Sequence, residues 1–527
     1  MENERCVQSS GGVLIDVHEQ GAQAGPTILA LHGHPDTSRV WDSVVSRLPD
    51  RYRVVRCDVQ GTGRFGADEV AAVLDAVGGD AVHVLAHGWG SAAVWQYLSR
   101  PGAQDRIASF TSASGPSREQ ISRYLRGALS RPQNPRRFAG GVGQLARLAA
   151  AAPRSVTDRA VRAHLRSAAA DTATVDIPVQ LIVASGDRYL APRFYDEMAA
   201  WAPRLWRRDL TAGHDTPRSH PQALADAVTQ LVDHLGGAPA SRELLRAQVG
   251  RPRKAFGDTL VSVTGAASGI GRETALAFAR EGADLLISDV DADGLDETAR
   301  LVGALGRQAH TYTVDVADAA AVESFAAQAC ADHGVPDIVV NNAGVGHAGF
   351  FLDTPAEEFD RVLDINLGGV VNGCRSFGKR LADRGTGGHI VNVASMASYT
   401  PVNVMNAYCT SKAAVYMFSD CLRAELDSFG IGLTTICPGI IGTNIVNTTR
   451  FSLPDERSYD AETIRRRVRR GFAVRHVGPD KVAAAIVSAV KANKPVRPVT
   501  TEAYLVYGVS HALPQAMRSA ARGGNIM

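Results

Sequence analysis

Short apolar runs alternate with helix-length segments along most of the chain. TILAL, VHVLAH, VQLIVA, TLVSVT and DLLISD are largely apolar, which is the pattern of strands buried in a sheet. The segments between them are long enough to form helices. Strands that alternate with helices in this way predict an α/β fold built on parallel sheets.

The pattern starts afresh once, which indicates two domains. At 527 residues the chain is too long for one ordinary hydrophobic core. Between Gly236 and Phe256 the run GGAPAS is followed by a short basic stretch, RPRKAFG, and this composition is typical of a linker. We therefore predict one domain over residues 1–236, a linker over 237–256 and a second domain over 257–527.

Composition and charge exclude several classes of protein. The formal net charge is +2, which gives no reason to expect a nucleic-acid partner. The N-terminus has no apolar signal core, and no apolar run reaches transmembrane length. The seven cysteines are scattered without CxxC pairs, so we expect neither a metal site nor a disulfide framework. The expected location is the cytoplasm.

A glycine-rich turn follows the first strand of the second domain. Gly265, Gly269 and Gly271 would let the backbone approach a pyrophosphate at the positive end of a helix. The next predicted strand ends near Asp289, whose carboxylate would accept hydrogen bonds from ribose hydroxyls and repel a 2′-phosphate. We therefore predict NAD as the cofactor, with NADP as the alternative that Arg272 would support.

Proton-transfer chemistry is predicted from Ser395, Tyr408 and Lys412. Tyr408 and Lys412 are four positions apart, so on a helix their side chains share one face. A neighbouring ammonium lowers the pKa of a phenol, which would make Tyr408 a usable general acid and base. Ser395 could hydrogen-bond the reacting oxygen. Because the chain has 50 arginines and only six lysines, a lysine at position 412 indicates a need for a compact ammonium.

Several motifs between residues 260 and 490 occur together and in a fixed order. They are TGAASGIG (264–271), VDV with Asp315, NNAG (341–344), DINLGG with Asn366, Ser395, Tyr408 with Lys412, and PGIIGT with Thr443. In this set the region resembles the short-chain dehydrogenases/reductases, a family of Rossmann-type oxidoreductases. The resemblance implies a domain with a parallel sheet that interconverts a secondary alcohol and a ketone.

The resemblance also implies a catalytic set of four residues. Tyr408 would exchange a proton with the substrate oxygen, and Ser395 would position that oxygen. Lys412 would lower the pKa of Tyr408 and bind the nicotinamide ribose. Asn366 would hold a water that links Lys412 to solvent.

The same resemblance places further residues at the cofactor. Asp315 would contact the adenine and Thr443 the nicotinamide amide. The residues expected there are Gly265, Ser268, Gly269, Ile270, Gly271, Asp289, Asp315, Val316, Asn342, Ala343, Gly344, Tyr408, Lys412, Pro438, Gly439 and Thr443.

Two units of the first domain, PTILALHGHPDTS and VHVLAHGWGSAAVW, each have a strand-like run followed by a glycine-containing turn. In these units the domain resembles the α/β-hydrolase fold, and is most similar to its epoxide-hydrolase branch. HGHP, beginning at His32, would precede the oxyanion contacts. In AHGWG, Gly88 stands before Trp89 at the position where the branch carries an attacking Asp. Glycine has no side chain and cannot attack. Asp187 and His214 stand where the acid and the base are expected, so this site is predicted to be a remnant.

The cap of the first domain is predicted over residues 117–174 and is short. It offers one tyrosine, Tyr124, where the branch usually has two. Together with Gly88, this favours a domain that has lost hydrolysis. Two alternatives stay open: a bifunctional enzyme in which His214 activates a water, and a docking module for a ligand or partner. Ser91 is expected to face away from the oxyanion hole.

Along nearly its full length the chain resembles bacterial fusions of an epoxide-hydrolase-like domain with a short-chain dehydrogenase. Family members with long C-terminal tails often take lipophilic substrates, and the resemblance implies that class here. The basic run Arg465–Arg470 is either a solvated helix face or a patch that contacts a membrane surface or an acyl carrier. The family's usual assembly implies a homodimer or homotetramer through the second domain.

Overall fold

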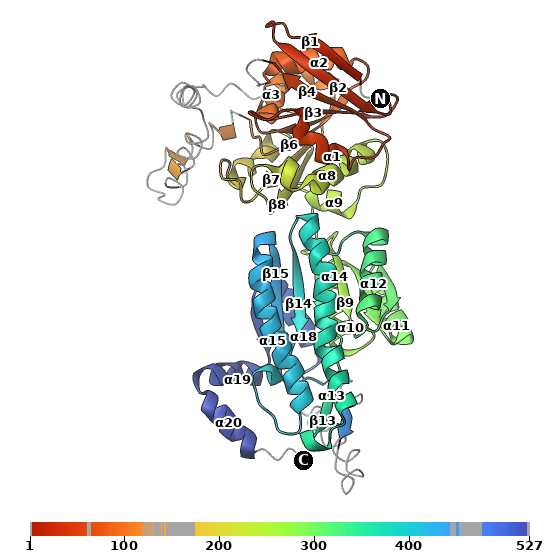
Figure 1. Cartoon of the computed structure of the whole chain (residues 1–527), viewed down its shortest axis with the longest axis vertical. Coiled ribbons are helices and arrows are strands. Elements are labelled where there is room, and N and C mark those ends of the chain that lie inside the picture. The colour runs from red at the N-terminus through yellow and green to blue at the C-terminus, as the bar shows by residue number, and fades with distance from the viewer. Residues whose placement is uncertain are drawn as a thin grey trace. The chain divides into compact units, whose positions relative to one another are not determined.

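The computed structural model describes residues 3–60, 65–117, 174–442, 449–452 and 477–523, with a few single positions between 120 and 143. The chain forms two compact units, Met1–Pro252 and Arg253–Met527, which Figure 1 shows in red to yellow-green and in green to blue. Most of the predicted cap, including Tyr124, lies outside the described residues, as do Thr443 and the run Arg465–Arg470.

The first unit is built on an eight-stranded sheet in the order β1-β2-β4-β3-β5-β6-β7-β8. The strands are β1 (Asn3–Gln8), β2 (Leu14–Gly21), β3 (Thr27–Leu31), β4 (Arg53–Val59), β5 (Val82–His87), β6 (Ile107–Ala113), β7 (Val179–Ala184) and β8 (Leu205–Leu210). β2 pairs antiparallel with β1 and β4, and every other neighbouring pair is parallel. The carboxyl ends of β3 and of β5 to β8 therefore meet at one edge of the sheet.

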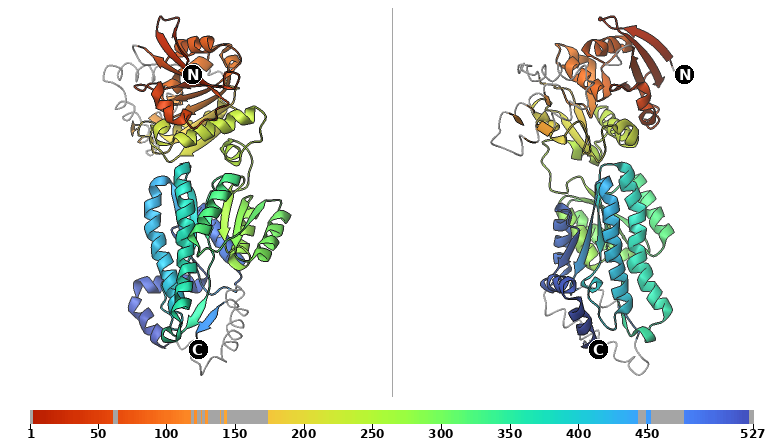
Figure 2. Two further views of the ribbon diagram at one scale, coloured as in Figure 1. Left: turned by 45° about the vertical axis from the view of Figure 1, so that its right-hand side comes forward. Right: turned by 60° about the vertical axis from the view of Figure 1, so that its left-hand side comes forward.

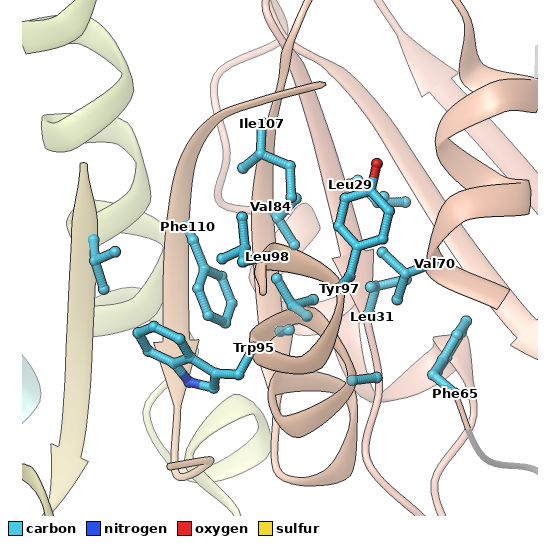
Figure 3. Close-up of a cluster of buried hydrophobic side chains, with 14 of the residues drawn as sticks. Leu29, Leu31, Phe65, Val70, Val84, Trp95, Tyr97, Leu98, Ile107 and Phe110 are labelled. Atoms are coloured by element: carbon cyan, nitrogen blue, oxygen red, sulfur yellow. The ribbon is translucent and has the colours of Figure 1, made fainter. Parts of the chain in front are cut away.

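Helices cover both faces of this sheet. They are α1 (Asp42–Val45), α2 (Ala67–Val77), α3 (Trp89–Leu98), α7 (Thr216–Ser219), α8 (Pro221–Leu235) and α9 (Arg242–Ala247), with short 3-10 turns at Ser38–Trp41, Ala103–Arg106, Pro192–Tyr195 and Met198–Ala200. On β5, Val84 belongs to the core cluster under α2 and α3, and the next residue, Leu85, belongs to the cluster under α1 and α8. Figure 3 shows the first cluster, in which Trp95 of α3 lies against Phe110 of β6.

The stretch predicted as a linker contains a helix. α9 buries Leu244 and Ala247 against Trp206 and Leu231 of the first unit. Phe256, at the end of the stretch, joins the core of the second unit. The linker composition therefore did not reveal a short amphipathic helix, because its few apolar residues contact a surface that is distant in sequence.

The second unit has a seven-stranded sheet in the order β11-β10-β9-β12-β14-β15-β17, and all its strands are parallel. The strands are β9 (Leu260–Thr264), β10 (Asp284–Asp289), β11 (Ala309–Thr313), β12 (Ile338–Asn341), β14 (Gly388–Val393), β15 (Ile431–Pro438) and β17 (Val496–Val499). A two-stranded pair, β13 (His347–Gly349) and β16 (Arg450–Ser452), is separate. The strand order reverses between β9 and β12, where parallel α/β sheets bind their ligands.

Helices also cover both faces of the second sheet, as the two views of Figure 2 show. The helices are α10 (Gly269–Arg280), α11 (Ala292–Ala304), α12 (Ala319–His333), α13 (Ala356–Leu363), α14 (Gly369–Arg384), α15 (Asn406–Leu426), α18 (Pro479–Lys491), α19 (Thr501–Ala512) and α20 (Pro514–Gly523). Val340 of β12 packs in the cluster under α10 and α18, and its neighbour Val339 in the cluster under α12, α14 and α15. None of the helices in the described ranges is long and apolar enough to span a membrane.

Candidate active site

The turn after β9 brings its backbone against the NNAG segment. Gly265 has a φ of +67°, and a Cβ built on it would stand 2.8 Å from the Cα of Ala343. A Cβ on Gly271 would stand 2.0 Å from the carbonyl oxygen of Gly265. Side chains are thus excluded at both positions. The structure brings the predicted turn residues together around one helix N-terminus.

The beginning of α10 is open to a ligand. Ser268 is exposed at the N-cap and forms no side-chain capping hydrogen bond. Gly269, with a φ of +56°, begins the helix and Ile270 is half-buried in the first turn. A helix of this length carries a partial positive charge at its N-terminus, which suits the pyrophosphate of a dinucleotide.

Asp289, the last residue of β10, holds the glycine turn in place. Its Oδ2 accepts a hydrogen bond from the backbone N–H of Ala267 at 3.0 Å, and its Oδ1 accepts from the N–H of Val290 at 2.8 Å and of Asp291 at 3.2 Å. A carboxylate has about four acceptor positions. Asp289 can therefore support the turn and still accept a ribose hydroxyl, although only the second role was predicted.

Arg272 is directed into the protein. Its Nε donates to Oγ1 of Thr298 at 3.0 Å, and its Nη2 donates to the carbonyl oxygens of Ala267 and Gly294, the latter at 3.2 Å. These bonds join the glycine turn to α11. The guanidinium is therefore largely occupied by structural contacts.

The NNAG segment is fixed to β9 by a residue that sequence reasoning missed. Oγ1 of Thr264 accepts hydrogen bonds from the backbone N–H of Asn342 at 3.0 Å and of Ala343 at 3.1 Å. In return, Nδ2 of Asn342 donates to the carbonyl oxygens of Thr264 and Gly265 at 3.0 and 3.2 Å. The place of Thr264, directly before the glycine turn, was the signal that could have identified it.

The remaining predicted cofactor residues lie at the carboxyl ends of β11 and β15. Asp315 is exposed after β11, and its Oδ1 accepts from the N–H of Ala317 at 3.0 Å, while Val316 beside it is buried. Pro438 ends β15. Gly439 follows it, and a Cβ there would stand 2.3 Å from Oγ1 of Thr500.

The structure brings the three proton-transfer residues together. Ser395 follows β14, and its hydroxyl hydrogen-bonds to the phenol of Tyr408 on α15. Lys412 is one turn further along α15 and is 4% exposed. Its Nζ donates to the carbonyl oxygen of Val393 at 2.9 Å, at the end of the strand that positions Ser395. One strand and one helix therefore hold the whole set.

Burial dominates the electrostatics of Tyr408 and Lys412. Burial raises the pKa of Tyr408, and the hydrogen bond from Ser395 opposes that rise. The ammonium of Lys412 is buried and donates to the carbonyl oxygen of Val393. The same burial lowers the pKa of Lys412 to about 8. The acid and the ammonium are thus poised by desolvation more than by each other.

Asn366 lies in a single π-helical turn, Asp364–Gly368, between α13 and α14. Such turns are rare and are frequent at functional sites. The side chain is fully buried: its Nδ2 donates to Oγ of Ser411 at 3.1 Å, and its Oδ1 accepts from the N–H of Val345 at 2.8 Å. A Cβ on Gly344 would stand 3.0 Å from Oδ1 of Asn366 and 3.4 Å from Nζ of Lys412. The structure therefore places Asn366, Gly344 and Lys412 around one small space.

The first unit has a second cluster of predicted residues at the elbow after β5. Gly88 has φ +54° and ψ −118° and precedes α3, which begins at Trp89. A Cβ built on Gly88 would stand 3.7 Å from Nε2 of His214 and 3.8 Å from the Cα of Gly33. The elbow conformation is therefore present without a nucleophile.

The expected acid and base are paired beside this elbow. Nδ1 of His214 lies 2.8 Å from Oδ2 of Asp187, and Oδ1 of Asp187 accepts from the N–H of Tyr189 at 2.8 Å. His32 is buried, with Nδ1 2.8 Å from the carbonyl oxygen of Gly33. Ser91 is fully buried and donates to the carbonyl oxygen of Ala86 at 2.7 Å, so it faces away from His214.

Comparisons with known proteins agree with this division. Residues 259–452 match the family model of short chain dehydrogenases, and residues 28–227 match that of the alpha/beta hydrolase family. A protein of Mycobacterium tuberculosis named "Probable oxidoreductase EphD" is 53% identical over 98% of this chain and 98% of its own length. The chain belongs to the family in which an α/β-hydrolase domain is fused to a short-chain dehydrogenase.

Other relatives match the second unit alone. D-threitol dehydrogenase of Mycolicibacterium smegmatis is 37% identical and covers 37% of this chain and 80% of its own length. A short chain dehydrogenase/reductase from Burkholderia phymatum, solved in complex with NAD, is 27% identical with a TM-score of 0.44, and covers 50% of this chain and 92% of its own. The family assignment makes the second unit an oxidoreductase domain whose cofactor is a nicotinamide dinucleotide. Within the described ranges, no group of three or more His, Cys, Asp or Glu side chains could hold a metal ion.

Proposed function

We propose that the second unit interconverts a secondary alcohol and a ketone of a lipophilic compound, with NAD as the preferred cofactor. The observation that carries this proposal is the grouping of Ser395, Tyr408 and Lys412 next to Gly344 of the NNAG segment. The glycine turn, which excludes side chains at Gly265 and Gly271, suits a dinucleotide backbone. When bound, the nicotinamide supplies or accepts a hydride.

The chain's own residues then handle the proton and the substrate. Ser395 hydrogen-bonds the substrate oxygen and holds it at the phenol of Tyr408. Tyr408 donates its proton to that oxygen during ketone reduction and accepts it during alcohol oxidation. Lys412 exchanges protons with Tyr408 from a site where its pKa is about 8, which suits transfer near neutral pH. Asn366 orders the space next to Lys412 through which the proton reaches solvent.

The preference for NAD rests on two side chains. The Asp289 carboxylate stands at the end of β10, where it accepts hydrogen bonds and repels a phosphate. Arg272, the nearest candidate for a phosphate partner in the turn, is engaged with Ala267, Gly294 and Thr298. A 2′-phosphate would therefore meet a negative charge without a free guanidinium to offset it.

Nicotinamide absorbance over a panel of lipophilic secondary alcohols, measured with NAD and then NADP, tests this function. We expect turnover with NAD and a loss of about 10²- to 10⁴-fold in Tyr408→Phe, with NAD binding retained. The variant Asp289→Ser should narrow the ratio of kcat/KM values between NAD and NADP, while kcat with NAD changes little. Equal turnover by the parent and by Tyr408→Phe would contradict the mechanism, and a parent preference for NADP would contradict the role of Asp289.

For the first unit, we propose that hydrolysis through a covalent intermediate does not occur, because Gly88 carries no nucleophile.

We also propose that the chain forms a dimer or tetramer through α14 and α15. Exposed apolar side chains support this assembly: Met417 on α15 is 61% exposed, and Phe429, just beyond its end, is 47% exposed. A monomer by light scattering at micromolar concentration would refute the assembly. Docking of a carrier or a membrane at Arg465–Arg470 stays a prediction.

A further inference from the structure

The first unit holds a histidine, His214, beside the glycine at its elbow. Nε2 of His214 stands 3.7 Å from the point where a Cβ on Gly88 would lie. From this side a general base could take a proton from an attacking group. Asp187 fixes the other ring nitrogen at 2.8 Å and is itself held by backbone N–H groups of Tyr189 and Leu190. An imidazole held in this way keeps its Nε2 lone pair for a ligand.

A second histidine, His87, is buried and lies beside the first, with 5.0 Å between the centroids of the His87 and His214 rings. Nε2 of His87 lies 2.9 Å from the carbonyl oxygen of His214, so that nitrogen carries the proton and donates. Nδ1 of His87 is then an acceptor, and in the described part of the chain it is buried without a hydrogen-bond partner. It lies 3.4 Å from the position of a Cβ on Gly33, and Gly33 is in turn next to Gly88. Buried polar atoms of this kind are usually satisfied by ordered water.

The space next to Gly88, where other residues would have a side chain, is therefore suited to a water that donates to these histidines. The elbow also directs the N-terminus of α3, a helix of ten residues, toward the same place. A partial positive charge at that terminus stabilises an oxyanion. Water, base and oxyanion site are the three parts that hydrolysis of an ester needs, whereas opening an epoxide through a covalent intermediate needs the carboxylate that position 88 lacks.

We propose that the first unit hydrolyses carboxylic esters by a direct water attack, in which His214, oriented by Asp187, acts as general base on a water above Gly88. The water oxygen bonds to the carbonyl carbon while His214 takes one of its protons, and the carbonyl electron pair moves to the oxygen. The carbonyl then re-forms and the carbon–oxygen bond to the alcohol breaks. The alkoxide takes the proton back from His214, so one ester and one water give one acid and one alcohol.

Hydrolysis of p-nitrophenyl butyrate and p-nitrophenyl octanoate by the full chain tests this proposal. We expect release of nitrophenol above the buffer rate, a loss of at least about 100-fold in His214→Gln, and a loss of at least about tenfold in Asp187→Asn. His220→Gln is the matched control, because the ring of His220 bonds to the hydroxyl of Ser219, whereas that of His214 bonds to Asp187. Thermal melting of each variant reports whether the unit is folded.

Three outcomes would overturn the proposal. The first is a parent rate equal to the buffer rate with both esters, and the second is an unchanged rate in His214→Gln. The third is a burst of nitrophenol or an acyl adduct in the intact mass, since either would mean that a side chain attacks. Ester hydrolysis is measured without a nicotinamide cofactor, so this proposal and that for the dehydrogenase fail or succeed independently.

Discussion

At the scale of single residues, the candidate cofactor site depends on glycines, because the absence of a Cβ lets two backbone segments come into contact. Gly271 is the third residue of α10, and its Cα lies so near the backbone of Gly265 that no Cβ fits. Asn342 is also close, with its Nδ2 2.7 Å from the same Cβ position. The glycine turn and the NNAG segment can therefore pack together only if position 271 is glycine.

Gly271→Ala should abolish NAD binding and destabilise the second unit. The added methyl must displace the turn backbone, and overpacking of this kind costs about 1–3 kcal/mol or more. Gly303→Ala is the control: Gly303 is on α11, and a Cβ there meets nothing within 4 Å. That variant should be unchanged or slightly more stable, since alanine favours helices. Calorimetry with and without NAD measures both effects, and an unimpaired Gly271→Ala would contradict the packing.

The raised pKa of Tyr408 gives a second test at this scale. In the cofactor-free chain the phenol should stay protonated up to pH 10 and ionise above it, because burial disfavours the phenolate. Ser395→Ala removes the group that opposes this shift and should move ionisation to still higher pH. The difference in phenolate absorbance between the parent and Tyr408→Phe follows this one group through a pH titration. Ionisation near neutral pH would mean that Lys412 dominates, as the sequence suggested.

Sequence reasoning predicted which residues come together better than it predicted the contacts that each one makes. Spacing was enough to place Tyr408 and Lys412 on one helix face, and the structure adds Ser395 to them through β14. It could not show that Lys412 is directed at Val393 or that Asp289 holds the turn. Both facts depend on where a carbonyl or an amide of a distant strand lies, and spacing along the chain carries no such information.

At the scale of elements, α19 braces two loops of the candidate site. The hydroxyl of Tyr399, just after the turn that holds Ser395, donates to the carbonyl oxygen of Ala503 at 3.2 Å. Oε1 of Glu502 accepts from the N–H of Ile440 at 3.4 Å, beside Gly439 of the cofactor loop. The Tyr399 ring also lies edge-on to Tyr507 of the same helix. The helix α19 therefore contacts both the loop after Ser395 and the loop that contains Gly439 and Ile440.

Glu502→Gln and Tyr399→Phe should weaken this brace without touching the chemistry. We expect KM for NAD to rise several-fold in Glu502→Gln and KM for the alcohol to rise in Tyr399→Phe, while kcat changes less than twofold, because one buried hydrogen bond contributes about 1 kcal/mol. Tyr504→Phe changes a half-exposed tyrosine of the same helix and is the control. A fall in kcat with an unchanged KM would assign these residues to the reaction step instead.

The C-terminal tail shows what periodicity misses at this scale. The spacing of the apolar residues Leu505, Val506, Val509, Leu513 and Met517 is by itself compatible with one helix. The structure instead has two helices, α19 and α20, which meet at Leu513 and Pro514, because proline lacks the N–H that would continue the first. Leu505 is 65% exposed, so only part of the apolar face contacts this unit.

At the scale of the whole molecule, each unit contains a buried neutral histidine. Burial lowers the pKa of His87 in the first unit to about 4, and that of His389 in the second to about 4. Both values lie below the ordinary value of 6.5. Between pH 4 and 6.5 the unfolded chain therefore binds more protons than the folded one, and stability falls as the pH falls.

Both units should lose about 1.4 kcal/mol of unfolding free energy per pH unit from each of these histidines as the pH drops from 6.5 to 4. Calorimetry across that range measures the loss as falling melting temperatures. His389→Gln should reduce the pH dependence of the second unit alone. His511→Gln is the control, because His511 lies at the exposed end of α19. A melting temperature that rises toward pH 4 would contradict the neutral state of both histidines.

The conformation of Gly88 has a consequence for the history of the chain. At a φ of +54°, a residue with a side chain is strained by about 1–3 kcal/mol, and active relatives would tolerate that strain for the sake of catalysis. Glycine adopts the same backbone freely. Glycine at position 88 therefore avoids the strain that an attacking side chain would bring to the first unit. A variant with a carboxylate side chain at position 88 would be less stable than the chain with glycine. Selection for stability alone would therefore favour glycine at this position.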